Sequence, residues 1–432
     1  MSREFDPAPL PTAQVVFLCA LFGLLYFVQG IAEPSEGLIS QPVRSMLRDW
    51  GTKPGDVSHL MALLVIPWSI KPLYGLIADF VPLGHARRRN WLIAATLVTT
   101  IGLGYVALHP PAAGETRLLF LMLLIPTIAV AFTDVVTDSL MVEHGQPHGL
   151  TGRLQSVQWA CLYGATILTG VVGGWLSEHK LQSLGFGICA VTAAASLVLA
   201  LTCVREPHRP QDEAPLMARI FAMRDALWSG RFLAAAAFLF LWNFNPFSSA
   251  ILQDYQVGHL QLGDAYYGRT VSVSAIASVI ACIAYGAYCP RLSVNALIHL
   301  SILAGVLTTL LYLGLRGPKS GYMLAAITGF TYMTGSLVQL DLAARVCPPA
   351  AAGTVFALLM SLSNFGIGGG MAVGGWLHNR FEPRLGPHLM FDVLVVTGAT
   401  ASALCWALYP WLKHPSTAEV DPAREMERGL GG

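Results

Sequence analysis

Hydrophobic residues follow one another in long blocks along this chain, and short polar segments separate the blocks. Each block is about 20 residues long, the length at which a helix crosses a hydrocarbon core of roughly 30 Å. The blocks are evenly apolar, whereas strands of a membrane barrel alternate between apolar and polar residues. Because a backbone in lipid must satisfy its own hydrogen bonds, we predict twelve transmembrane helices. The predicted spans are residues 13–33, 57–79, 91–109, 117–142, 153–177, 184–204, 232–255, 265–288, 293–315, 320–345, 353–378 and 388–411.

A polar segment containing three prolines follows the sixth predicted span. It divides the spans into two groups of six. The predicted organisation is an N-terminal half at 1–204, a cytoplasmic linker at 205–231, a C-terminal half at 232–411 and a cytoplasmic tail at 412–432.

The two predicted halves resemble each other in sequence. Gly152 and the segment Val172–Leu176 of the fifth span match Gly353 and Val373–Leu377 of the eleventh without gaps. Asp138 and Asp341 occupy similar places in the fourth and tenth spans. A repeat of six helices in each half is how many secondary transporters are built.

The composition fits a membrane protein. The chain has 54% hydrophobic and only 12% charged residues, and its net charge is +1, where a soluble domain carries roughly 25% charged residues. Nucleic acid is therefore not expected as a partner. The eight cysteines form no CxxC pair, so neither a metal site nor a disulfide framework is predicted. We find no nucleophile with a base and no phosphate loop, so neither an enzyme nor a cofactor is expected.

Lysine and arginine are more frequent on the side of the N-terminus. This bias predicts that both termini are cytoplasmic. We expect a multi-pass protein of a bacterial inner membrane.

Two carboxylates mark the fourth span. Ionisable side chains at bilayer depth cost at least about 2.5–3.5 kcal/mol, so each is a candidate for function. Asp134 and Asp138 are four residues apart and share one helical face. Neighbouring carboxylates favour proton binding, which suits a proton-coupling site. The alternative is structural pairing with Arg153 or Lys71.

Lys71 lies between two prolines of the second span, Pro67 and Pro72. Proline lacks a backbone donor, and Pro72 frees the carbonyl of Trp68. A lysine on an interrupted helix is a good anchor for an anionic group. It can equally extend from a helix end to the membrane surface, or pair with a carboxylate.

Polar side chains in other spans complete the candidate lining. Gln155 and Trp159 share a face, and an amide beside an aromatic ring suits a flat heteroaromatic solute. Such a tryptophan also commonly serves packing or anchoring at the membrane interface. Asp341 and Arg345 are four residues apart and can neutralise each other. The remaining candidates are Gln29, Glu33, Asn243, Asn245, Gln253 and Asn364.

Asp79 ends the second span and is followed by the arginine cluster Arg87–Arg89. We predict that Asp79 and Arg88 form a charged latch that holds one gate closed. A basic loop on the cytoplasmic side also explains the cluster.

Several stretches resemble known families. Gly75 and Asp79 with the following basic residues resemble the loop signature of the major facilitator superfamily, with extra residues inserted. Five other stretches resemble the folate–biopterin transporter family. They are Tyr26–Gly30; Pro67–Gly75 through Arg89; Asp134–Glu143 with Gly152–Ser156 and Trp159; Leu342–Pro348 through Gly353–Ser361 with Asn364; and the segment after Asn245.

This resemblance implies a major-facilitator fold and proton-driven uptake of folates or pterins by alternating access. Trp159 and Gln155 would hold the ring, and Lys71 or Arg345 the carboxylate. The expected partners are the small anion, protons and membrane lipid, and a monomer is expected. The alternatives are a carrier for another organic anion, a nucleoside or a muropeptide, since one fold serves many solutes, or a membrane assembly factor that transports nothing.

Overall fold

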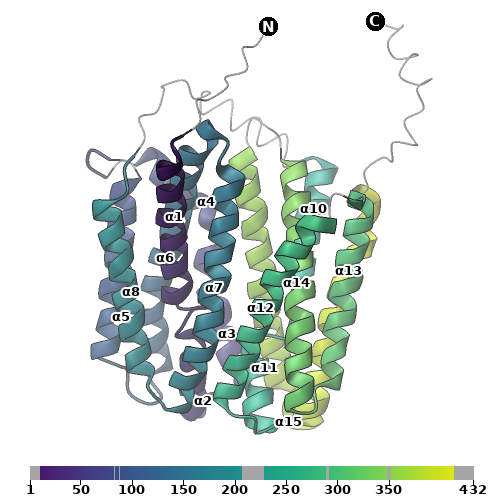
Figure 1. Cartoon of the computed structure of the whole chain (residues 1–432). Coiled ribbons are helices and arrows are strands. Elements are labelled where there is room, and N and C mark those ends of the chain that lie inside the picture. The colour runs from purple at the N-terminus through teal and green to yellow at the C-terminus, as the bar shows by residue number, and fades with distance from the viewer. Residues whose placement is uncertain are drawn as a thin grey trace, which may run out of the picture.

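The computed structural model describes residues 10–81, 83–86, 88–206, 228–288, 291–347 and 352–412. The predicted linker (from residue 207 to 227) and tail (beyond 412) lie outside the described residues. Long helices run side by side along one direction (Figure 1). The first turn of α1 and the last turn of α15 lie at one end, which we call the terminal end; the other is the opposite end.

Successive crossings alternate in direction between these two ends. The N-terminal half contains α1 (Thr12–Ala32), α2 (Ser40–Asp49), α3 (Pro54–Ser69), α4 (Lys71–Phe80), α5 (Arg89–Leu108), α6 (Thr116–Gly145), α7 (Thr151–Glu178) and α8 (Gln182–Thr202). The C-terminal half contains α10 (Gly230–Asn243), α11 (Ser249–Asp254), η2 (Tyr255–His259), α12 (Asp264–Tyr288), α13 (Val294–Leu311), α14 (Pro318–Val346) and α15 (Ala352–Leu412).

The helix bounds agree with twelve crossings. Ten helices of the described residues are long and apolar enough to cross a membrane. The last of them, α15, changes direction at Gly386, whose φ of 76° is left-handed, and so contributes two crossings. The shorter α10 makes another together with α11, which ends before His259.

The first helix of each half is interrupted, which the sequence patterns did not predict. α1 ends before Glu33-Pro34, and α10 ends before Asn245-Pro246. In both breaks the polar side chain caps the following turn: the Glu33 carboxylate accepts from the Ser35 N–H at 2.8 Å, and Asn245 Oδ1 accepts from the Phe247 N–H at 3.0 Å. Such local side-chain bonds replace the helical bonds that proline removes.

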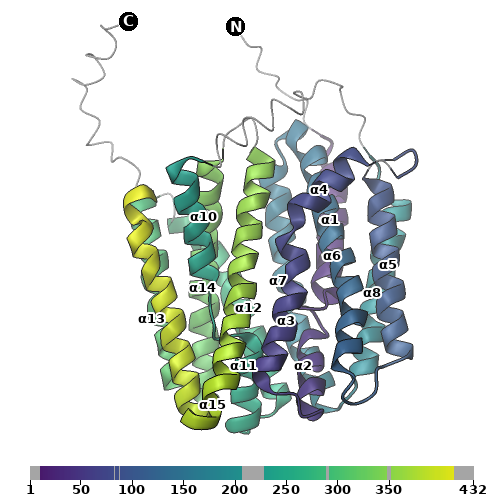
Figure 2. The same cartoon turned by 180° about the vertical axis from the view of Figure 1, so that it is seen from behind.

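The two halves touch along α3 with α15 and along α7 with α12; Figure 2 shows α3 beside α15. A methyl group on Gly268 would lie 2.2 Å from the Gly170 carbonyl oxygen, and one on Gly55 would lie 2.3 Å from the Gly375 carbonyl oxygen. Glycine is therefore required for helix backbones to approach this closely. These contacts lie toward the opposite end.

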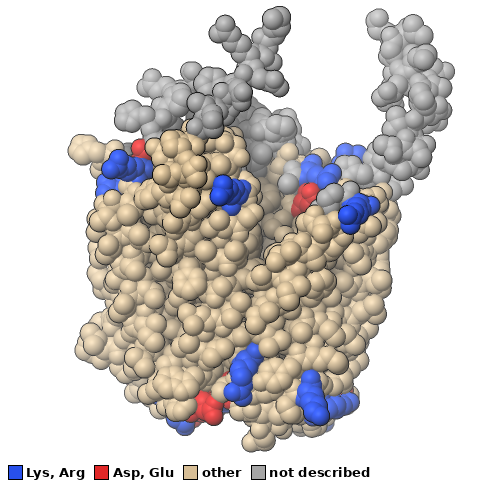
Figure 3. All heavy atoms as spheres, in the orientation of Figure 1, with Lys and Arg blue, Asp and Glu red and all other residues tan. Residues whose placement is uncertain are grey.

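Charged side chains gather near the two ends, and a belt without them crosses the middle of the molecule (Figure 3). On this face the surface is hollowed between the halves toward the terminal end. The belt and the apolar helices are those of a protein that spans a membrane.

Candidate functional site

An ion pair lies inside the N-terminal half. Lys71 Nζ is 2.5 Å from Asp134 Oδ2, and Gln29 Nε2 donates to the other carboxylate oxygen at 2.6 Å. The Asp134 side chain is only 7% exposed. The pairing offsets much of the cost of burying either charge alone.

Asp138 lies beside this pair, one helical turn further along α6. Its carboxylate accepts hydrogen bonds from the Tyr26 hydroxyl and, at 3.2 Å, from Gln158 Nε2. Both of these donors are neutral. The two carboxylates therefore differ in their partners: Asp134 is bound to a cation, and Asp138 is bound to neutral groups. We call Tyr26, Gln29, Lys71, Asp134, Asp138 and Gln158 the central cluster.

The break between α3 and α4 places Lys71 in the central cluster. Ile70 separates the two helices, and Lys71 begins the second one. The Lys71 ammonium lies 4.7 Å from the centre of the Trp68 ring, a cation–π contact. The Trp68 carbonyl accepts from Asn364 Nδ2 of the C-terminal half at 2.9 Å.

Gln155 and Trp159 lie exposed on α7, in the same half as the central cluster. The Trp159 and Tyr163 rings stack with their centres 6.2 Å apart. The Tyr163 hydroxyl donates to Met333 Sδ of α14 at 2.7 Å, so this aromatic face reaches the C-terminal half.

The polar residues of the C-terminal half form separate groups. Asn243 Nδ2 donates to Gln339 Oε1 at 2.7 Å. Asp341 and Arg345 form an ion pair at 3.0 Å with both side chains partly exposed, the mutual neutralisation that their spacing favours. Glu33 and Asn245 serve the two helix breaks and do not join the central cluster.

Gln253 lies in a network that joins the halves at the opposite end. Arg44 Nε donates to Gln253 Oε1 at 2.7 Å, and Gln253 Nε2 donates to Asp264 at 3.2 Å. Asp264 also accepts from Arg48 and from the Ser45 hydroxyl, each at 2.6 Å. We call these five residues the inter-half latch. Among ion pairs of the described residues, only Arg48–Asp264 joins the two halves.

Sequence reasoning missed Arg44, Arg48 and Asp264 because they lie outside the predicted spans. The first predicted span ends at residue 33. A prediction that a helix resumes after Pro34, as α2 does, would have placed Arg44 and Arg48 inside the protein. The available signal was the regular spacing of Arg44 and Arg48, which places both on one helical face.

The predicted gate at the terminal end is described in part. Arg88 is buried and forms an ion pair with Glu143 at the end of α6. Its backbone N–H donates to Glu206 at 3.1 Å, which ties the start of α5 to the segment after α8. The Asp79 side chain lies outside the described residues, so its pairing with Arg88 stays a prediction.

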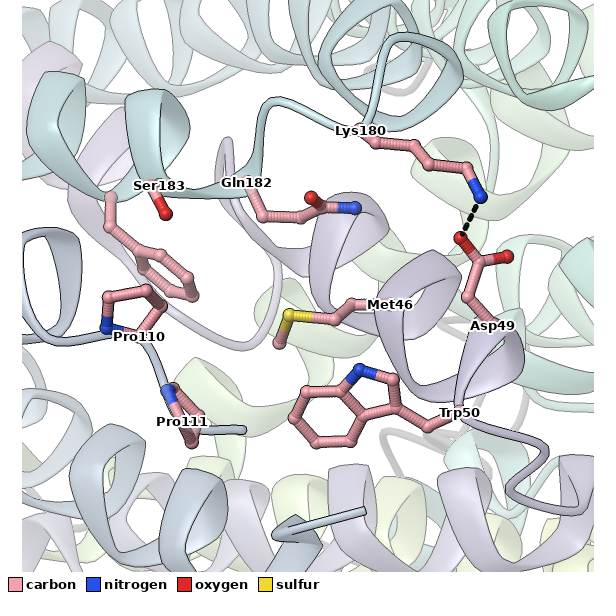
Figure 4. Close-up of a pocket in the computed structure, with 9 residues that line it drawn as sticks. Met46, Asp49, Trp50, Pro110, Pro111, Lys180, Gln182 and Ser183 are labelled. Atoms are coloured by element: carbon pink, nitrogen blue, oxygen red, sulfur yellow. Dashed lines mark ion pairs between the residues drawn. The ribbon is translucent and has the colours of Figure 1, made fainter. Parts of the chain in front are cut away.

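A cavity of about 250 Å³ opens at the opposite end, within the N-terminal half (Figure 4). The Asp49–Lys180 ion pair, 3.0 Å long, crosses its rim, and Trp50 and Met46 of α2 line it. This peripheral cavity contains none of the predicted site residues.

The chain matches the sequence model of the BT1 family over residues 29–426. It belongs to the BT1 family. A folate-biopterin transporter of Synechocystis sp. is 30% identical over 358 residues, which cover 79% of this chain and 70% of that protein. Folate transporter 1 of Plasmodium falciparum is 20% identical over 363 residues, which cover 79% of this chain and 69% of that protein. The resemblance to folate–biopterin transporters is confirmed.

Solved transporters share the fold of this BT1-family chain. The nucleoside transporter NupG superposes with a TM-score of 0.71 at 16% identity, covering 92% of this chain and all (100%) of that one. A D-xylose–proton symporter gives 0.66 at 14% identity, covering 93% and 99%. The predicted all-α major-facilitator fold is confirmed. The protein is a multi-pass membrane transporter and not an enzyme.

Proposed function

We propose that this protein takes up folate- or pterin-like anions, driven by protons, by alternating access in a bacterial inner membrane. The observation that carries the proposal is the Lys71–Asp134 ion pair with Asp138 beside it. Relatives named as folate and folate-biopterin transporters support the substrate class.

Lys71 is the proposed anchor for the substrate carboxylate. Its present partner is the Asp134 carboxylate, which a carboxylate of the substrate can replace without leaving a buried cation unpaired. Trp159 presents an aromatic face for the ring, and Gln155 shares that face of α7.

Asp138 is the proposed proton carrier. Its hydrogen-bond partners are neutral, so adding a proton there breaks no ion pair. Asp134 is bound to Lys71, and its protonation would release that cation. The negative charge of Asp138, one helical turn from Asp134, also acts on Lys71. A proton on Asp138 therefore makes the surroundings of Lys71 less negative and favours binding of an anion there.

The arrangement of the halves indicates which state of the proposed cycle the structure represents. The inter-half latch closes the opposite end, and the surface is hollowed at the terminal end. With cytoplasmic termini this is an inward-open state of a monomer, and opening of the latch would give the outward-open state.

A carrier for a neutral nucleoside is the second candidate, because NupG is a structural relative. That likeness concerns the fold alone. A buried lysine paired with a carboxylate favours an anion, which can exchange with the carboxylate.

The test is uptake of labelled folic acid into vesicles that hold the purified protein, with and without an inward proton gradient. We expect gradient-driven uptake by the native chain and at least about a thirtyfold loss per folded protein in Lys71→Met/Asp134→Asn, since a buried charged anchor contributes at least about 2 kcal/mol. The double variant removes the anchor without leaving a buried charge unpaired. Lys180→Met removes a lysine from the peripheral cavity and should retain uptake. Absence of uptake for every folate and pterin, by native protein that is folded, would rule out this substrate class.

A further inference from the structure

The break between α3 and α4 leaves the backbone carbonyl of Trp68 without its helical partner. The carbonyl of Trp68 would accept from the N–H four residues later in a continuous helix, but that residue is Pro72. The carbonyl accepts instead from Asn364 Nδ2, at 2.9 Å. Asn364 lies on α15, in the other half of the protein.

Trp68 makes two different contacts, one through its ring and one through its backbone carbonyl. Its ring lies 4.7 Å from the Lys71 ammonium, and its carbonyl is bound by Asn364. Lys71 in turn contacts Asp134 at 2.5 Å. A shift of Asn364 relative to α3 is therefore transmitted to the backbone beside the central cluster.

We propose that Asn364 is a positioning residue of the transport cycle, which holds the α3–α4 break so that Lys71 meets Asp134. The proposal rests on the proposed role of Lys71 as the anion anchor. Asn364 acts through the Trp68 carbonyl and does not touch the substrate. Because the bond crosses the two halves, the position of Lys71 depends on how the halves are placed.

The bond also ties the state of the break to alternating access. A partly buried carbonyl without a donor is unfavourable, so the break is held in this form only while Asn364 is within reach. When the halves separate at this depth, the carbonyl must find water or the break must change shape. Lys71 is therefore held differently in the two end states of the cycle.

Pro72→Ala gives a direct test, because the substituted alanine has a backbone N–H that can bond to the Trp68 carbonyl. In the native background we expect Asn364→Ala to reduce folic acid uptake about tenfold, as expected for the loss of one partly buried hydrogen bond. We expect Pro72→Ala to lower uptake as well, because the restored N–H lets the helix continue across the break. Adding Asn364→Ala to Pro72→Ala should change uptake by less than about twofold. Independent effects would multiply instead.

A second measurement separates positioning from substrate contact. Asn364→Ala should raise the apparent KM for folic acid about tenfold and leave that for biopterin, which has no carboxylate, within about twofold. A residue that contacts the pterin ring would weaken both. An equal loss for the two compounds would overturn the proposal.

Asn379→Ala is the matched control. Asn379 is another α15 asparagine that donates to the N-terminal half, to Asp56 Oδ1 at 2.7 Å, but at the opposite end. Its effect should be the same in the native chain and in Pro72→Ala. If Asn364→Ala also has the same effect in both backgrounds, the proposed link to the Trp68 carbonyl is wrong.

Melting temperatures can be measured without a substrate. The four chains to compare are the native chain, Pro72→Ala, Asn364→Ala and the double variant. Asn364→Ala should lower the melting temperature of the native chain and leave that of Pro72→Ala unchanged. If this pattern of melting temperatures is found but the native chain takes up no folate, the proposed function is wrong and the hydrogen bond between Asn364 and Trp68 stands. Coupling in melting temperature without coupling in uptake would reject the positioning role.

Discussion

Asp138 in the N-terminal half and Gln339 in the C-terminal half lie at equivalent places. The spacing that relates Gly152 to Gly353 also relates Asp138 to Gln339. Asp138 accepts from Tyr26 of α1, and Gln339 accepts from Asn243 of α10. Both halves have kept a hydrogen bond between their first and fourth spans, but only the N-terminal half has an ionisable group there.

The orientation of the Gln339 amide shows what the C-terminal half has instead. Asn243 Nδ2 donates to the Leu239 carbonyl at 2.8 Å, which fixes the direction of the Asn243 amide. Gln339 must therefore turn its oxygen toward Asn243, and its Nε2 has no acceptor among the described residues. One half thus carries groups that change charge, and the other carries a neutral donor with a fixed direction.

The largest effect is expected at the ion pair. Asp134→Asn leaves Lys71 without its counter-ion, and removing one partner of a buried pair costs about 3–5 kcal/mol. We expect most of the folded protein to be lost, measured by gel filtration in detergent. The double variant Lys71→Met/Asp134→Asn should recover folding but not uptake.

Normal amounts of folded Asp134→Asn would contradict this assignment of the pair. Recovery of uptake in the double variant would show that the pair stabilises the fold and has no part in transport.

The next largest effect is expected at Asp138. Asp138→Asn keeps the size of the side chain and removes the proton site, so gradient-driven uptake should fall about thirtyfold, or roughly 2 kcal/mol. Exchange of labelled for unlabelled folic acid at equal pH should stay within about threefold. Equal losses in both assays would assign Asp138 to binding.

A smaller loss is expected at the equivalent position of the C-terminal half. Gln339→Glu keeps the acceptor for Asn243 but replaces the free donor with an acceptor, so uptake should fall about tenfold. Gln182→Glu in the peripheral cavity makes the same chemical change and should have little effect. Unchanged uptake by Gln339→Glu would mean that the free donor serves no ligand.

The smallest effect is expected at the surface of the C-terminal half. A hydrogen bond to Asp254 raises the pKa of His259, and Glu382 adds to this. The stabilisation is complete below the usual histidine pKa of about 6.5 and is lost as pH rises through the raised value. His259→Asn should therefore lower the melting temperature by about 1–2 °C at pH 5.5 and less at pH 8.5. An equal shift at both pH values would contradict the pairing.

Apolar block length predicted the spans well, because a helix in lipid has few alternatives. Lys71, Asp134 and Asp138 were also identified as candidates from the sequence, because a charged side chain is costly inside a membrane span. The helix breaks that contain Glu33 and Asn245 were not predicted, because a short interruption barely changes mean hydropathy. The latch arginines and Asp264 escaped because their burial comes from packing between halves, which no local pattern reports. The pairing of Asp138 with Asp341 was wrong, because the gap-free offset between the halves takes Asp138 to Gln339. Asp341 forms a separate local pair with Arg345.

The Lys71–Asp134 pair also bears on how the chain is made. Lys71 leaves the ribosome 63 residues before its partner, a delay of about 3–13 s at about 5–20 residues per second. During that time the second span carries a lone cation, which costs about 2.5–3.5 kcal/mol at the centre of a helix in the bilayer. We therefore expect the second span to wait at the translocon and to enter the lipid together with the fourth.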